Sequence, residues 1–172
     1  MIFVGGVHGV GKTHFCSLLK ERLGIPAYSA SQLISDVKQS GFSPDKRVAD
    51  IDENQMYLLE AIDNLRSKGS EFLLDGHFCL LNADSEIIRI SENTFIRLNP
   101  DAIVLITENS DVIAKRRFER DHVEHKADDI ARFQEAEISY AREIAGKLGI
   151  PLIVSYGSND VNETIEFIRG RM

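Results

Sequence analysis

The chain has 172 residues, and its length and 43% hydrophobic content suit one domain with a full core, leaving no room for a second enzymatic module. Its formal net charge of -7 argues against general nucleic-acid binding by the whole surface. Cys16 and Cys79 form no C-x-x-C pair, which favours a reduced, cytoplasmic protein, and no stretch approaches the roughly 20 apolar residues of a membrane span.

The N-terminal segment combines a short apolar run with a glycine-rich motif. Residues 1–5 predict a buried strand and are too few for the apolar core of a signal peptide. Residues 6–13, GVHGVGKT, match the pattern G-x-x-x-x-G-K-[ST] at every position. Apolar residues then recur at helical spacing from residue 14 to residue 23. A strand, a glycine-rich loop and a helix N-terminus together predict a phosphate-binding loop, because a chance glycine-rich turn would lack this context.

The residue types in this loop suit a nucleoside triphosphate. Glycines at positions 6, 9 and 11 lack a Cβ, so that backbone N–H groups can converge on phosphate oxygens. Lys12 can reach the β- and γ-phosphates, and Thr13 offers a hydroxyl to Mg²⁺. The predicted nucleotide-binding residues are Gly6, His8, Gly9, Val10, Gly11, Lys12, Thr13 and His14.

The next segment predicts a short strand over residues 25–28, a serine-rich cap at 29–31 and a helix through about Lys38. A longer helix is predicted over residues 49–67. Its apolar stripe consists of Ile51, Leu58, Ile62 and Leu65. Asn54 and Gln55 fall in the gap of this stripe, so at least one should point inward, either to contact a base or sugar or to pack between helices.

A second chemical signal stands at residues 71–77, where an apolar run ends in Asp75, Gly76 and His77. An acid at the end of a strand beside a phosphate loop can hold Mg²⁺ together with Thr13, although Asp-Gly is also a common turn pair. His77 either orients a water or an acceptor, or is a hydrogen-bonded structural histidine. Residues 86–90 predict a small edge strand, and residues 81–86 match no phosphate chemistry, so this stretch either shapes an acceptor pocket or offers an edge to a partner.

The third signal is a basic helix that follows a predicted buried strand at residues 102–106. Residues 115–120 contain four cations, and Arg116 and Arg120 share one helix face, so they could grip the same anion. We therefore predict a lid around residues 107–127 whose arginines stabilise charge during phosphoryl transfer. The alternative is a solvated helix with Lys115–Glu119 and Arg117–Asp121 pairs.

The C-terminal part predicts a long amphipathic helix over residues 128–148, a strand over 151–154 and a closing helix from about Asn159. Strands that alternate with helices predict a parallel sheet with helices on both faces. The ligand of such a sheet lies at the carboxyl ends of the strands.

Together these features resemble the P-loop nucleoside monophosphate kinase superfamily, and most nearly the archaeal-type adenylate kinases and related small ATP-binding proteins. The resemblance covers most of the chain and rests on residues 6–13, on Asp75-Gly76-His77, on the basic helix that ends at Arg120-Asp121, and on the helix 128–148. It implies an α/β P-loop NTPase fold with a five-stranded parallel sheet of order 2-3-1-4-5. It also implies an arginine-bearing lid and Mg²⁺-ATP as the phosphoryl donor.

The function implied is transfer of the γ-phosphoryl group of ATP to a nucleotide-like small acceptor. No membrane association is expected, and no protein partner is identified. The predicted catalytic residues are Lys12, Asp75, Arg116, Arg117 and Arg120, with Thr13 and Asp75 on the metal. Residues 31–35 and 76–81 lack the arginines with which such kinases often hold a monophosphate, and Lys46 and Arg47 either substitute for them or serve the surface. The alternatives are therefore a kinase for a nucleic-acid end or another metabolite, and a regulatory ATPase switch.

Overall fold

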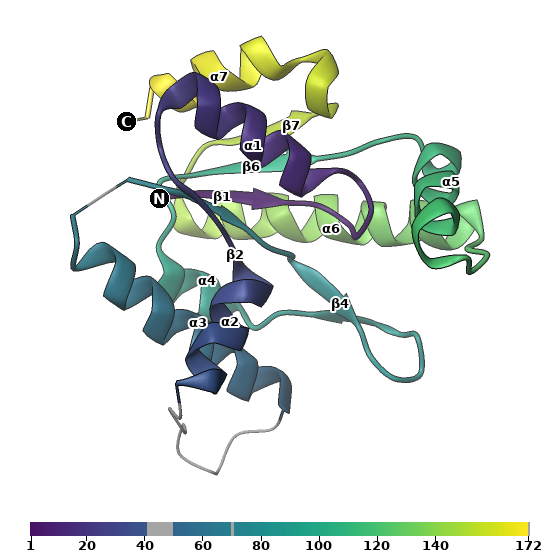
Figure 1. Ribbon diagram of the computed structural model, residues 1–172, viewed down its shortest axis with the longest axis horizontal. Helices are drawn as coiled ribbons and strands as arrows, with labels where there is room; N and C mark the ends of the chain where they lie inside the picture. Colours follow the sequence, from purple (N-terminus) through teal and green to yellow (C-terminus); the bar gives the residue numbers. More distant parts are fainter. Residues whose placement is uncertain (41–49, 70, 172) are drawn as a thin grey trace.

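The computed structural model describes residues 1–40, 50–69 and 71–171, and its centre is a parallel β-sheet (Figure 1). The strands of this sheet lie in the order β2-β3-β1-β6-β7. Their bounds are β1 Ile2–Gly5, β2 Ala27–Ser29, β3 Leu73–Asp75, β6 Ala102–Ile106 and β7 Leu152–Ser155. When these five strands are numbered alone, the order is 2-3-1-4-5, so the predicted topology is confirmed.

Helices cover both faces of the sheet. Helices α1 (Lys12–Leu23) and α7 (Val161–Arg169) pack together on one face, and α6 (Ala127–Leu148) packs on β6, β7 and α4 (Glu92–Leu98) on the other (Figure 1). Helices α2 (Ala30–Gln39) and α3 (Asp50–Arg66) pack against each other, and α3 also contacts α4. Because both faces are covered, β1 and β6 are apolar and buried along their whole length.

An aromatic cluster joins the sheet to its helices. Phe3 of β1 lies 5.0 Å from Phe78 and 5.6 Å from Phe95 of α4, measured between ring centroids. Phe78 stacks on Phe95 at 4.8 Å, and Tyr140 of α6 meets both rings edge-on. Large rings bury much apolar area and prefer such offset geometries, so the cluster fixes the chain that follows β3.

The structure corrects the prediction for residues 79–98. Ile87–Arg89 form β5, but this strand pairs antiparallel with β4 (Cys79–Leu81) in a separate two-stranded sheet and is not an edge of the main sheet. The turn between them is closed by the Asn82 side chain, which accepts hydrogen bonds from the N–H groups of Asp84 and Glu86. β4 and α4 were not predicted, because neither has a long periodic pattern and the turn has no Asn-Gly pair.

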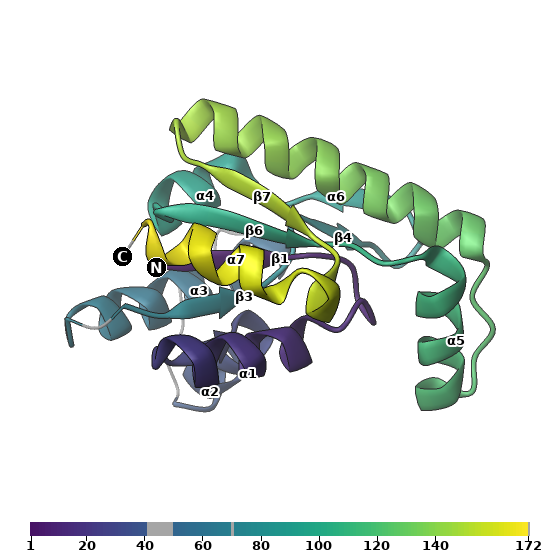
Figure 2. The same ribbon diagram turned by 90° about the horizontal axis from the view of Figure 1, so that it is seen from above.

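The register of the sheet brings the segments that carry chemistry to one edge. Asp75 at the end of β3 is level with Val4 of β1 and with Ser29 of β2. The predicted second strand, residues 25–28, is shifted to Ala27–Ser29, so that Ser29 ends the strand directly before α2. Figure 2 shows α5 (Ser110–Asp121) standing at the same edge, beyond the end of β6.

None of the helices that the structure describes is long and apolar enough to cross a bilayer.

Candidate active site

The loop between β1 and α1 has the backbone conformation that its glycines predict. Gly6, Gly9 and Gly11 have φ angles of 147°, 82° and 104°. A Cβ at Gly6 would lie 2.7 Å from the carbonyl oxygen of Ile106, so this position also needs glycine for close approach to β6. Helix α1 begins at Lys12, and the N–H groups of its first turn have no carbonyl partner within the helix. These N–H groups are therefore available to phosphate oxygens.

A cavity of about 370 Å³, called the phosphate-loop cavity below, lies over this loop. It is lined by His8, Gly9, Gly11, Lys12, Thr13, Ser29, Ala30, Ser31, Asp75, Gly76, His77, Arg116 and Arg120. The predicted residues Val10 and His14 line a different cavity of about 410 Å³, between α1, the end of β6 and residues 156–159. The two cavities share Gly11 and Arg116.

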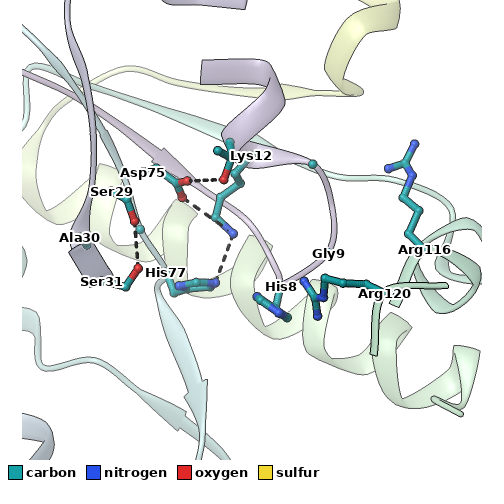
Figure 3. Close-up of a pocket in the computed structure, with 13 residues that line it drawn as sticks. His8, Gly9, Lys12, Ser29, Ala30, Ser31, Asp75, His77, Arg116 and Arg120 are labelled. Carbon is teal, nitrogen blue, oxygen red and sulfur yellow. Dashed lines mark hydrogen bonds and ion pairs between the residues drawn. The ribbon is translucent and has the colours of Figure 1, made fainter. Parts of the chain in front are cut away.

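Lys12 is a buried cation held inside the site. Its ammonium donates to the carbonyl oxygens of Gly6 at 2.7 Å and Val7 at 3.2 Å, and it lies 4.0 Å from Asp75 Oδ1. Burial lowers the pKa of Lys12, and the negative charges of Asp75 and Glu137 act in the opposite direction. Figure 3 shows the ammonium between Asp75 and His77.

His77 accepts a hydrogen bond from Lys12, with 3.1 Å between Nε2 and Nζ. An ammonium can only donate, so the imidazole is neutral and carries its proton on Nδ1. Burial, together with the positive charges of Lys12, His8 and Arg117, lowers the pKa of His77 to about 3. His77 is thus a hydrogen-bonded histidine and also a lining residue of the phosphate-loop cavity.

Asp75 and Thr13 are adjacent, with the Thr13 hydroxyl donating to Asp75 Oδ2 at 3.4 Å. Burial raises the pKa of Asp75, while the charge of Lys12 and the Thr13 hydrogen bond lower it. Mg²⁺ prefers such oxygen ligands, usually one or two protein oxygens with water and phosphate completing the shell. The pair therefore fits a magnesium ion next to the loop.

Arg116 and Arg120 of α5 lie on the side of the loop away from Asp75 (Figure 3). Arg117 is 7% exposed and donates through Nε and Nη2 to the carbonyl oxygen of His8, at 2.8 and 2.6 Å. Arg116 donates to the carbonyl oxygen of Val10 at 3.1 Å. It also forms an ion pair with Glu108, with 3.3 Å between Nη2 and Oε2. Arg120 extends toward His8 (Figure 3). Arg116 and Arg120 thus line the cavity, and both Arg116 and Arg117 fasten the helix to the loop.

Part of the solvated-helix alternative is also present. Lys115 and Glu119 are exposed and lie 3.9 Å apart. Asp121, however, pairs with Arg120 and not with Arg117. The exposed outer face of α5 therefore coexists with an inner face that contacts the loop.

Three polar side chains on the inner face of α6 have roles that were not predicted from the sequence. The Gln134 amide bonds to the N–H and the carbonyl of Glu108, and the Tyr140 hydroxyl donates to the carbonyl of Ile90. Glu137, only 1% exposed, accepts from the N–H groups of Phe78 and Cys79 at 3.1 Å. Each side chain fixes a segment that follows a strand. In the sequence, the signal for these contacts is the position of Glu137 and Gln134 on the apolar stripe of an amphipathic helix.

Glu137 gives a prediction for stability against pH. Burial raises the pKa of Glu137 to about 7, although the two N–H groups and Lys12 act in the opposite direction. The folded protein therefore holds this proton more tightly than the unfolded chain, and Glu137 makes folding less favourable as the pH rises from about 4.5 to about 7. We expect Glu137→Gln to lack this pH dependence, which is worth on the order of 1–3 kcal/mol.

Urea unfolding of both proteins at pH 5 and pH 8 measures the effect. The stability of the parent minus that of Glu137→Gln should be larger at pH 5 than at pH 8, and taking the difference cancels the other titrating groups. If the difference in unfolding free energy between the parent and Glu137→Gln is the same at both pH values, folding does not raise the pKa of Glu137.

The part of the chain that forms this site matches a known protein family. The AAA domain family matches residues 5–134, which include the loop, Asp75 and α5. A protein of Methanocaldococcus jannaschii named "Putative adenylate kinase" is 27% identical over 118 residues. This match covers 67% of the chain but only 55% of the relative, so it spans little more than half of that protein.

Two crystal structures have a similar fold over nearly their whole length. One is an uncharacterized protein from Eubacterium ventriosum, with 17% identity, and the other is a gluconokinase from Sinorhizobium meliloti, with 14% identity. Each has a TM-score of 0.52 and covers 98% of this chain and 95% of the solved chain. The structural likeness shows that the chain has the fold of the P-loop kinases. The family match over residues 5–134 shows that the chain belongs to the AAA domain family.

Proposed function

We propose that the protein is a Mg²⁺-dependent phosphotransferase that moves the γ-phosphoryl group of ATP to a small acceptor. The observation that carries the proposal is the meeting of three features around one cavity of about 370 Å³: the phosphate loop, the Thr13–Asp75 pair and the arginines Arg116 and Arg120. Two of the similar proteins are named "Putative adenylate kinase" and gluconokinase, and both names support the same class of reaction.

The donor would lie along the loop. Backbone N–H groups and Lys12 would bind the β- and γ-phosphates, and Thr13 and Asp75 would hold the metal. When bound, Mg²⁺ neutralises charge on the phosphate oxygens. A triphosphate would compete with His77 for the Lys12 ammonium, because charged acceptors bond more strongly than a neutral ring nitrogen. The cavity beyond Arg116, with Val10 and His14, would take the nucleoside part of the donor.

The acceptor would lie on the other side of His77. A second cavity of about 200 Å³ shares Ala30, Ser31, Gly76 and His77 with the phosphate-loop cavity. A molecule bound there would have its reacting group next to the γ-phosphate. Positioning of the two substrates and electrostatic stabilisation would supply most of the catalysis. Lys46 and Arg47, the predicted alternatives for holding an acceptor, lie outside the described residues.

The arginines would act on the charge that develops during transfer. Arg116 and Arg120 line the cavity, and their guanidinium groups suit phosphoryl oxygens. Arg117 would act indirectly, since two of its N–H groups hold the His8 carbonyl and so the shape of the loop. This division separates two roles within the predicted lid helix.

Replacing Arg116 and Arg120 together with glutamine should lower kcat about 100-fold or more while weakening ATP binding much less. The reason is that charge in the transition state is bound more tightly than charge in the ground state. Gln and Arg have similar helix propensity, so α5 should persist. Transfer from labelled ATP to nucleosides, monophosphates and oligonucleotide ends measures the effect.

The control is Lys115→Gln, which removes an exposed cation from the same helix outside the cavity. Unchanged single-turnover transfer in the double variant would support the solvated-helix alternative. Equal losses in ATP affinity and kcat/KM with kcat unchanged would make the arginines donor-binding groups. A regulatory ATPase switch would hydrolyse ATP without acceptor-dependent transfer in the parent protein.

A further inference from the structure

The second cavity, between α2, α3, α4 and the end of β3, has walls that are mainly apolar. Phe3, Leu58, Phe95 and Leu98 are buried residues that line it, and its volume is about 200 Å³. Apolar walls with a few hydrogen-bonding groups are typical of sites for small organic molecules. The site is continuous with the phosphate loop, because four residues line both cavities.

Apart from Ser31 and His77 at the mouth, three uncharged polar side chains interrupt these walls. Gln55 is 8% exposed and Thr94 is 5% exposed, and Asn54 is partly buried. Gln55 is thus the inward-pointing amide that the helical spacing predicted. Within the described chain, no hydrogen bond is formed by the side chains of Gln55, Asn54 or Thr94. The hydrogen-bonding groups of these three side chains are therefore available to a molecule bound in the cavity.

Their polar atoms reach open space. Of the described side chains, the fully enclosed polar atoms without a partner are the hydroxyls of Thr107 and Thr164. Gln55 and Thr94 are absent from that set, so their polar atoms are accessible from a cavity. Both residues also border a shallower hollow of about 140 Å³ beside Arg97, whereas Asn54 belongs to the lining of the larger cavity.

The described lining of this cavity includes no Asp, Glu, Lys or Arg side chain. A phosphomonoester carries about 1.5 to 2 negative charges at neutral pH, and a buried charge without a partner is costly. Lys12, Arg116 and Arg120 line the neighbouring cavity, where the donor phosphates would occupy them. At the shared mouth the described polar side chains are the Ser31 hydroxyl and the His77 ring, and Nε2 of this ring already faces the Lys12 ammonium.

We propose that the acceptor is an uncharged alcohol with a planar, hydrogen-bonding ring, such as a nucleoside, and not a phosphomonoester. The ring packs between the apolar walls and bonds to the amides of Asn54 and Gln55, which offer both donors and acceptors. Its hydroxyl lies at the mouth beside Ser31 and His77. This inference rests on the proposed phosphotransferase function and specifies its acceptor.

The transfer is balanced without a further reactant. The bond from the γ-phosphorus to the β–γ bridging oxygen of ATP breaks, and a bond from the γ-phosphorus to the acceptor hydroxyl oxygen forms. ADP leaves, and the hydroxyl proton is released to water. The product is a phosphomonoester, which the uncharged cavity binds less well than the alcohol, so product release is favoured.

Matched pairs of acceptors test the inference with the full chain, Mg²⁺ and labelled ATP. The probes are adenosine and AMP, guanosine and GMP, cytidine and CMP, and uridine and UMP. At least one nucleoside should be phosphorylated with a kcat/KM about tenfold or more above that of its own monophosphate. Preference for the monophosphate, or no transfer to any nucleoside, overturns the acceptor assignment. Two different results would overturn the phosphotransferase proposal itself: no Lys12-dependent ATP binding, or ATP hydrolysis without transfer to any acceptor.

Gln55→Leu supplies the residue-level test, because leucine fills a similar volume without the amide. The variant should raise KM for the preferred nucleoside about tenfold and leave the Kd for ATP unchanged. Gln39→Leu, at an exposed glutamine of α2, is the matched control. Thermal unfolding establishes that both variants are folded. An unchanged KM in folded Gln55→Leu would show that Gln55 is a packing amide and would contradict the assigned ring contact.

Discussion

Replacing Lys12 with alanine should weaken the binding of Mg²⁺-ATP about tenfold or more while leaving the fold intact. The variant loses a charge-assisted contact worth roughly 1.5–3 kcal/mol, and each 1.4 kcal/mol is about a factor of ten in affinity. The fold should tolerate the change, because the hydrogen bonds from Lys12 to Gly6, Val7 and His77 are offset by the cost of burying its ammonium. Calorimetric titration with Mg²⁺-ATP measures the affinity.

Lys20→Ala is the control for this prediction, since Lys20 is an exposed lysine in the last turn of the same helix. It should bind ATP like the parent protein. An unchanged ATP affinity in folded Lys12→Ala would rule out the phosphate-binding role of residues 6–13.

Asp75→Asn should strongly lower turnover and raise the Mg²⁺ concentration needed for half-maximal activity. Asparagine keeps the shape and can still accept from the Thr13 hydroxyl, but it lacks the charge that favours a divalent cation. If Asp75 holds the metal, directly or through water, its loss should cost about 10- to 100-fold, as for the loss of an outer-shell partner. The measurement is the rate of phosphoryl transfer across a magnesium titration.

The matched control is Asp84→Asn, at an exposed acid in the turn between β4 and β5. Its metal titration should coincide with that of the parent. If the curve for Asp75→Asn also coincides with the parent curve, Asp75 is only a turn residue and the metal lies elsewhere.

The loop and the main sheet could be predicted from the sequence because their signals are contiguous. The backbone angles at Gly6, Gly9 and Gly11 are a local property that glycine alone adopts readily, and the strand and helix patterns flank them directly. The position of Asp75 followed from the same reasoning, since parallel strands end at a common edge. The β4–β5 hairpin and α4 escaped prediction because their short segments depend on packing against α6 and Phe3.

The roles of the three arginines depended on how α5 docks. The sequence placed Arg116, Arg117 and Arg120 on one helix and predicted a shared face for the first and last. Only the tertiary structure brings the His8 carbonyl to Arg117 and leaves Arg116 and Arg120 on the cavity. The angle and distance between a helix and a loop more than 100 residues away follow from packing, which no local pattern encodes.

By itself, the sequence determined the phosphate loop, the acid at the end of β3 and the alternation that makes a parallel sheet, because each is set by backbone preference and periodicity within a short segment. Only the tertiary structure decided what the buried polar groups do. Glu137 meets the N–H groups of Phe78 and Cys79 across almost 60 residues of chain, and Gln55 faces a cavity made by α2, α3 and α4. Such contacts arise where several elements meet, since a polar side chain on an apolar helix stripe shows that a partner is needed but not which partner the fold supplies.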